Sequence, residues 1–129
     1  MTFWAIQDRS TLSGANNYAL SLVNLQRFKE AKALLRKAMP VARRVLGDRD
    51  RLTLKMRKMY GEALCRDNGP TLDDLREGVT TLEDVERTTR RVFGGAHPLT
   101  RSIEGDLRDA RAALRARETP PPPPPSESV

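Results

Sequence analysis

Apolar side chains recur every three or four residues along most of the chain, which is the spacing of one face of an amphipathic helix. The first clear stripe consists of Leu12, Ala15, Ala19 and Leu22. Five such stripes predict five helices, over residues 11–25, 28–46, 52–67, 72–93 and 98–117. Because the connections between them are short, neighbouring helices should run antiparallel. The pattern therefore predicts an all-α fold.

Glycine, proline and capping residues agree with these boundaries. Gly47 and Gly94 follow the second and fourth stripes, where a helix commonly ends in a left-handed residue. Thr71, with Asp74 three positions later, resembles a capping box at the start of the fourth helix. Pro40 lies inside the second stripe and removes one backbone hydrogen bond. Since the apolar spacing resumes after Pro40, we expect a kink there and no break.

A short motif occurs twice, as VLGDRDRLT at residues 45–53 and as VFGGAHPLT at residues 92–100. A weaker correspondence places Tyr18 in the register of Tyr60. A single helical hairpin has too little apolar surface to be stable alone, so repeated hairpins must stack on one another. We therefore expect an α-α superhelix. Its domain would span residues 1–118, with repeats at 8–47 and 50–94, a capping helix at 98–117 and a disordered proline-rich tail at 119–129.

The second repeat departs from the first at positions that should pack between helices. Gly61 lies near the place of a small alanine, and Gly78 falls where the first repeat has Ala31. Thr80 and Thr81 replace apolar residues. We therefore expect the helices of the second repeat to pack more loosely than those of the first.

Charge is unevenly distributed along the chain. The formal net charge is +6, and residues 1–60 hold thirteen Lys or Arg against four Asp or Glu. Such a basic half can attract an acidic peptide, a nucleic acid or an anionic membrane surface, and salt would weaken all three. On the second helix, Lys29, Lys32, Arg36 and Arg43 follow helical spacing and are interpreted as a solvated outer face.

Chemistry-bearing residues are few and scattered. Cys65 is the single cysteine, which indicates a reducing, cytoplasmic location and argues against structural zinc. His97 is the single histidine and is interpreted as a turn or capping residue, and Asp73 and Asp74 suit the first turn of a helix. No run of apolar residues approaches the roughly 20 that cross a bilayer. We expect no enzyme, cofactor or metal site.

The segments NNYAL at residues 16–20, RFKEA at 27–31 and VLG at 45–47 resemble a tetratricopeptide repeat of the kinesin light chain type, and His97-Pro98 resembles the opening of another such repeat. This resemblance implies a protein-binding module in which an extended or helical peptide occupies a concave groove. In the resembling fold, Tyr18 would fill the space between helices. The first helix of each repeat would line the groove.

The resemblance implies eight groove residues: Ser13, Asn16, Leu20, Asn24, Lys55, Lys58, Glu62 and Arg66. Asparagine amides can hydrogen-bond a peptide backbone, and lysine attracts carboxylates. The expected ligand is therefore an acidic peptide segment, and the expected function is that of an adaptor.

Three alternatives remain open on the sequence alone. The basic half could bind RNA or another polyanion, although aromatic residues for base stacking are scarce. The six prolines at 120–125 could form a polyproline II ligand for an SH3, WW or profilin-type partner. Exposed Phe3 and Trp4 could drive self-association or dock on a preceding repeat.

Overall fold

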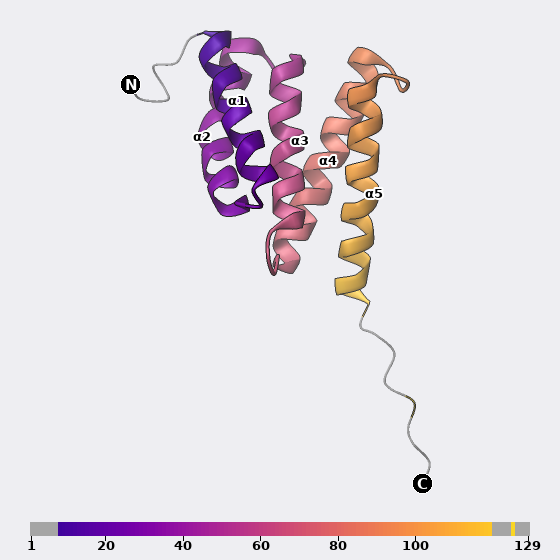
Figure 1. Ribbon diagram of the computed structural model, residues 1–129. Coiled ribbons are helices and arrows are strands. Elements are labelled where there is room, and N and C mark those ends of the chain that lie inside the picture. Colours follow the sequence, from indigo (N-terminus) through magenta and orange to yellow (C-terminus); the bar gives the residue numbers. More distant parts are fainter. Residues whose placement is uncertain (1–7, 120–124, 126–129) are drawn as a thin grey trace.

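The computed structural model describes residues 8–119 and Pro125, and residues 8–119 form an array of helices (Figure 1). Its elements are α1 (Arg9–Asn24), α2 (Phe28–Leu46), α3 (Arg51–Arg66), α4 (Leu72–Phe93) and α5 (Pro98–Glu118). No strand occurs in this part of the chain. The predicted all-α fold is confirmed, and each helix begins and ends within two residues of its predicted bounds. Most of the expected disordered tail, residues 120–124 and 126–129, and the apolar Phe3 and Trp4 lie outside the described residues.

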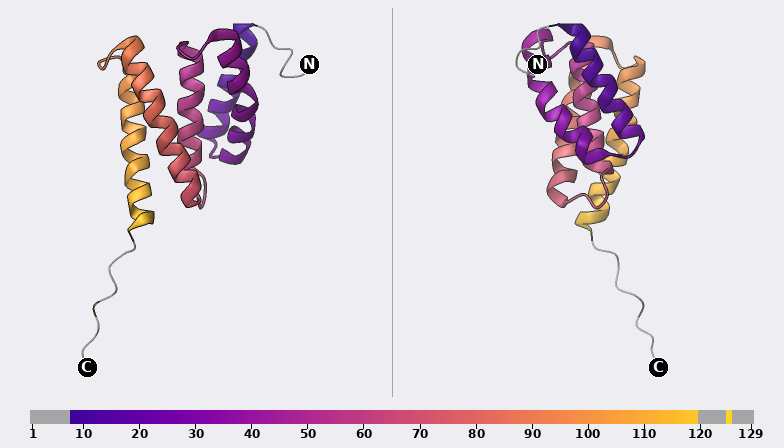
Figure 2. Two further views of the ribbon diagram at one scale, coloured as in Figure 1. Left: turned by 180° about the vertical axis from the view of Figure 1, so that it is seen from behind. Right: turned by 60° about the vertical axis from the view of Figure 1, so that its left-hand side comes forward.

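The helices form an open stack of antiparallel hairpins (Figure 2). Each helix packs on the next one along the chain, α3 also contacts both α1 and α5, and α2 does not contact α4. Since α3 contacts both α1 and α5, whereas α2 does not contact α4, the odd-numbered helices form the more closely packed side of the stack. We call that side the inner face and the side of α2 and α4 the outer face. This is the arrangement of an α-α superhelix.

The apolar core consists of two clusters, and α3 contributes to both. Met56 and Leu64 pack in the first cluster with α1 and α2, whereas Leu54 packs in the second with α4 and α5. All three side chains are fully buried. Because α3 supplies side chains to both clusters, neither hairpin has a core of its own, as expected for stacked repeats.

Tyr18 is not part of this core, so the prediction that it fills the space between helices is wrong. Its side chain is 57% exposed, whereas Tyr60, in the same register of the next repeat, is 7% exposed. The Tyr60 hydroxyl accepts a hydrogen bond from Arg36 Nε of α2 at 3.0 Å. Tyr18 is at the start of the array, where no described helix occupies the place that α2 takes beside Tyr60.

The two glycines of the second repeat bring α3 and α4 close together, so the expected loose packing is contradicted. A methyl group at Gly61 would lie 2.8 Å from Leu82 Cγ. One at Gly78 would lie 3.1 Å from the Gly61 carbonyl oxygen and would collide with Cys65 Sγ. Both separations are shorter than ordinary packing permits. The space that a side chain would take at each glycine is therefore already occupied by atoms of the facing helix.

Several helix ends carry the predicted caps. The Thr71 hydroxyl accepts from the Asp74 N–H, and the Asp74 carboxylate accepts from the Thr71 N–H, each at 3.0 Å, which completes the capping box. His97 caps α5, because its Nδ1 accepts from the Leu99 N–H at 3.1 Å. Helix α2 continues through Pro40 without a break. These contacts confirm the interpretations of Thr71, Asp74 and His97.

Candidate peptide-binding face

The eight predicted groove residues lie on α1 and α3, two of the three helices of the inner face. The structure places seven of them in three surroundings, a basic cleft, an acidic cleft and the exposed C-terminal half of α1, and it buries Asn16. It also adds residues that the sequence reasoning missed, on α5 and at the N-terminal ends of α1 and α3. The three surroundings differ in charge and polarity, and these differences decide which parts of a peptide each can bind.

The basic cleft lies between the N-terminal halves of α1 and α3 and has a volume of about 240 Å³. It is lined by Arg9, Ser13, Arg51, Leu52 and Lys55. Arg9 forms an ion pair with Asp50, whose carboxylate also caps α3 by accepting from the Leu52 N–H. Within the described residues, Arg51 and Lys55 have no carboxylate partner. Two cations of this cleft are therefore available to a ligand.

Only Ser13 and Lys55 of this cleft were predicted as site residues. Arg9 and Arg51 were missed because the prediction followed one stripe along each helix. The cleft instead joins the N-terminal end of α1, where Arg9 lies, to the N-terminal end of α3, where Arg51 lies. The charge count gave a usable signal, since Arg9 and Arg51 both belong to the basic first half of the chain.

The acidic cleft lies between α3 and α5 and has a volume of about 210 Å³. It is lined by Glu62, Cys65, Arg66, Leu82, Asp106, Asp109, Ala110 and Ala113. Lys58 Nζ lies 2.8 Å from Asp106 Oδ2 and 3.7 Å from a Glu62 carboxylate oxygen, and Arg66 pairs with Glu62 at 2.5 Å. In the part of the chain that the structure describes, two of the three predicted cations of α3, Lys58 and Arg66, are thus neutralised by carboxylates of the same face, whereas Lys55 is not.

Burial shifts the proton affinities of two groups in the acidic cleft. It raises the pKa of the Asp106 carboxyl above its usual value, although the hydrogen bond and charge of Lys58 oppose that change. Burial, together with the negative charges of Asp106 and Asp74, raises the pKa of the Cys65 thiol to about 11. A thiol with this pKa remains protonated at neutral pH and is a poor nucleophile. Among the described residues, no cluster of three His, Cys, Asp or Glu side chains is placed to hold a metal ion.

Asn16 is buried, and Arg66 already has partners within the protein. Asn16 is only 8% exposed, and its buried Oδ1 has no hydrogen-bond partner in the described part of the chain. The Arg66 guanidinium lies 5.3 Å from the centre of the Phe28 ring, a cation–π contact that joins α3 to α2. Asn16 therefore has an unused acceptor, whereas Arg66 has two partners within the protein.

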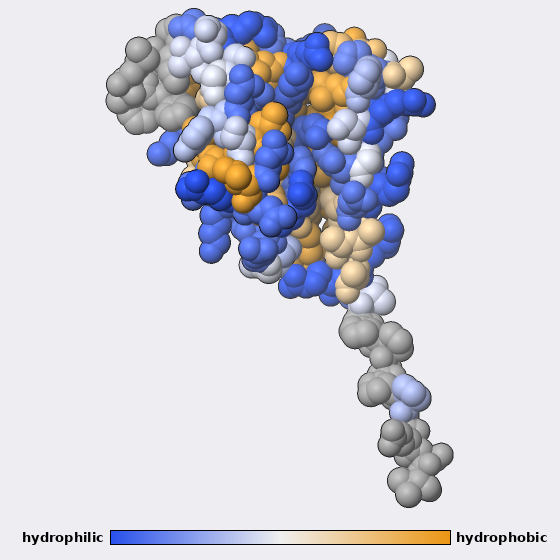
Figure 3. All heavy atoms as spheres, in the orientation of Figure 1, coloured by the Kyte–Doolittle hydropathy of each residue, from blue (hydrophilic) through white to orange (hydrophobic). Residues whose placement is uncertain are grey.

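The C-terminal half of α1 presents apolar surface. Leu20 is 46% exposed, Leu25 just beyond the helix is 66% exposed, and Asn24 is exposed as well. Figure 3 views the molecule from the side on which α1 lies in front and shows an apolar patch over α1 within a largely hydrophilic surface. This surface can contact apolar side chains of a ligand.

An open stack of antiparallel helical hairpins defines the class of helical-repeat proteins. Residues 11–51, which contain most of α1 and all of α2, match the family model described as "Tetratricopeptide repeat". Residues 11–51 are therefore similar to a tetratricopeptide repeat, a kind of repeat that generally mediates protein–protein interaction. No curated protein and no solved structure matches the chain significantly. In the described part of the chain, no helix has the length and apolar character needed to cross a membrane.

Proposed function

We propose that this chain is a protein-interaction adaptor that holds an acidic peptide on its inner face, across α1 and α3. The observation that carries the proposal is the basic cleft, where Arg51 and Lys55 have no carboxylate partner among the described residues. A peptide carboxylate there would gain charge-assisted hydrogen bonds without breaking an ion pair of the protein. We propose no catalytic role.

The rest of the α1 surface supplies the contacts that a peptide backbone and apolar side chains require. The exposed amide of Asn24 can hydrogen-bond a peptide backbone, whereas the Oδ1 of Asn16 is buried and out of reach of a peptide on this face. The exposed Leu20 offers apolar contact further along the helix. In this proposal the peptide runs along α1, with its acidic residues beside Ser13 and Lys55.

The acidic cleft limits where the negative charges of the peptide can lie. Lys58 is held by Asp106 and Glu62, so its charge is already compensated. An acidic residue placed over α5 would face Asp109, which has no cation partner within residues 8–119. The proposal therefore places the acidic segment near α1 and away from α5.

A fluorescence-anisotropy titration tests this proposal. The probe is a fluorescein-labelled peptide of alternating Glu and Leu, titrated with the full chain and with its Lys55→Ala and Arg51→Ala variants. We expect each variant to weaken binding about 3- to 10-fold, the range of one charge-assisted contact at a partly exposed site. The matched control is Lys37→Ala, which removes an exposed cation from α2 and should leave the affinity unchanged. An equal loss in all three variants would contradict the groove assignment.

A single-stranded RNA of matched length forms the second arm of this experiment. Stacking on bases requires exposed aromatic side chains. Within residues 8–119, Tyr18 is the one aromatic residue among the large apolar side chains that are exposed. RNA should therefore bind only at low salt and without preference for the Lys55 site. Tight RNA binding at physiological salt would favour a polyanion-binding function instead.

Two finer assignments accompany this proposal. We propose that the first repeat is of the kinesin light chain type, on the strength of the NNYAL and VLG segments at residues 16–20 and 45–47. We also propose a cytoplasmic location, where a single unpaired thiol such as Cys65 persists in reduced form. A role of the proline segment toward an SH3, WW or profilin-type partner stays a prediction, because it depends on the tail beyond α5.

A further inference from the structure

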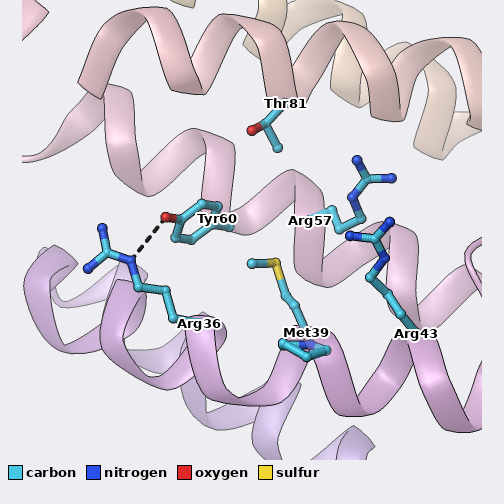
Figure 4. A pocket seen from close by; sticks show the side chains of 7 residues that line it. Arg36, Met39, Arg43, Arg57, Tyr60 and Thr81 are labelled. Carbon is cyan, nitrogen blue, oxygen red and sulfur yellow. Dashed lines mark hydrogen bonds between the residues drawn. The ribbon is translucent and has the colours of Figure 1, made fainter. Parts of the chain in front are cut away.

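The outer face contains a cleft of about 500 Å³ that the proposed function does not use (Figure 4). It lies over α3, between α2 and α4, where those two helices do not touch. Its lining consists of Arg36, Met39, Pro40, Arg43, Arg57, Tyr60 and Thr81. Three guanidinium groups and no carboxylate line this space, so it is richer in guanidinium groups than either cleft of the inner face.

The α2 cations match the solvated outer face that the sequence suggested only in part. Lys32 of the same helix is buried and pairs with Asp67 at 2.7 Å. Arg36 donates to the Tyr60 hydroxyl, and its guanidinium lies 5.7 Å from the centre of the Tyr60 ring. The interpretation is therefore wrong for Lys32, which is buried, whereas the other three cations are exposed.

Two of the three arginines are held at one end of the cleft by carboxylates outside its lining. Arg43 Nε donates to Asp48 at 2.6 Å, and Arg57 donates to Asp84. In Figure 4 the guanidinium groups of Arg43 and Arg57 lie together, whereas Arg36 lies at the other end beyond Met39 and Tyr60. Each guanidinium has five N–H donors, and one such bond to a carboxylate leaves the others free.

We propose that the Arg43–Arg57 end of this cleft binds a phosphate monoester carried by a side chain of a partner peptide. Two adjacent guanidinium groups with several free donors suit a tetrahedral dianion with three acceptor oxygens better than a planar carboxylate with two. Asp48 and Asp84 already engage these arginines, so a competing ligand needs more than one negative charge. A phosphate monoester carries about −1.5 to −2 at pH 7.

The size of the cleft indicates that the phosphate arrives on a larger molecule. A volume of about 500 Å³ exceeds what an inorganic phosphate fills, and the floor between the two ends is formed by Met39, Pro40 and Tyr60. Residues next to the phosphorylated side chain would lie on this partly apolar floor and reach Arg36. The site is on the opposite face from the basic cleft, so its failure leaves the proposed function unaffected.

The test is an NMR titration of the full chain that follows the arginine Nε–Hε signals. The ligands are a neutral peptide with one phosphoserine, the same peptide with serine, inorganic phosphate, and acetate at matched ionic strength. We expect saturable shifts of the Arg43 and Arg57 signals with the phosphopeptide, weaker ones with inorganic phosphate, and none with serine peptide or acetate. Equal shifts with the phosphorylated and unphosphorylated peptides would overturn the proposal, as would shifts centred on Arg51.

Two substitutions of opposite expected effect sharpen the assignment. Arg43→Met keeps the aliphatic stem and should weaken phosphopeptide binding at least about 10-fold. Asp48→Asn frees Arg43 from its exposed ion pair and should tighten binding about 3-fold. The controls Lys37→Met and Asp73→Asn make the same charge changes at exposed positions outside the cleft and should change the affinity less than 2-fold. If either control matches its partner variant, the effect is one of net charge, and the proposed site is refuted.

Discussion

The contact between α3 and α4 gives the sharpest test of the packing, because two glycines permit it. In the interior of a helix, Gly→Ala ordinarily stabilises a protein by up to about 1 kcal/mol, since alanine loses less backbone entropy on folding. At Gly78 the added methyl group would meet Cys65 Sγ and would lie 3.1 Å from a backbone oxygen of α3. Overpacking of this kind costs about 1–3 kcal/mol. Gly78→Ala should therefore destabilise the protein or leave its stability unchanged.

Gly14 supplies the matched control. It lies inside α1, and a methyl group there would have no neighbour within 4 Å. Gly14→Ala should raise the free energy of unfolding by about 0.5–1 kcal/mol. The two variants share the same gain in helix propensity, so their difference isolates the packing cost of about 1–3 kcal/mol. Thermal and urea unfolding followed by circular dichroism would measure it, with a change in Tm of roughly 4–8 °C for each kcal/mol.

A double variant identifies the atom responsible. Cys65→Ala removes the Sγ that a methyl group at position 78 would meet, but leaves the Gly61 carbonyl oxygen in place. Cys65→Ala in the Gly78→Ala background should therefore recover part of the lost stability, as a coupling between the two sites. If Gly78→Ala stabilises as much as Gly14→Ala does, then α3 and α4 are not in close contact and the packing argument is refuted.

Three further predictions concern single interactions. Lys32→Met leaves the Asp67 carboxylate, about 12% exposed, without its cation and should lower the free energy of unfolding in urea by about 2–4 kcal/mol. The control Arg27→Met, at an exposed ion pair, should lower it by under about 1 kcal/mol. The Thr71 N–H, which donates to the Asp74 carboxylate, lowers the pKa of that group. Its stabilisation is therefore present above the unfolded value of about 4 and is lost as the pH falls, so the stability difference between the parent and Asp74→Asn should shrink below that pH. With a pKa of about 11, Cys65 should react with a thiol reagent at pH 8 about 100-fold more slowly in the native protein than in urea, and equal rates would show an accessible thiol.

The helices could be predicted from the sequence because their signals are local. Apolar spacing, the capping pair Thr71 and Asp74, and the glycines after α2 and α4 act within a few residues of one another. The tight approach at Gly61 and Gly78 could not be read in this way. An absent side chain indicates either a gap or a close contact, and only the position of the facing helix decides between them.

The candidate sites were harder to predict because charge on a helix face does not reveal its partner. Lys55 and Lys58 looked equivalent in the sequence, yet Asp106 of α5 neutralises only Lys58. Arg43 and Arg57 belong to different helices, and the sequence gave no sign that they border one cleft. Pairings of this kind depend on contacts between residues far apart in the chain, which the periodicity of each helix cannot show.

The opposite charges of the two inner-face clefts lead to one last prediction, about the direction of a bound peptide. Lys55 in the basic cleft favours carboxylates, whereas Asp109 in the acidic cleft favours cations. A peptide with acidic residues at one end and lysines at the other can satisfy both clefts, but a uniformly acidic peptide meets repulsion over α5. The two-signed peptide should therefore bind about 3-fold tighter at low salt. Asp109→Asn should remove that advantage, and a preference that survives the substitution would show that the acidic cleft plays no part in binding.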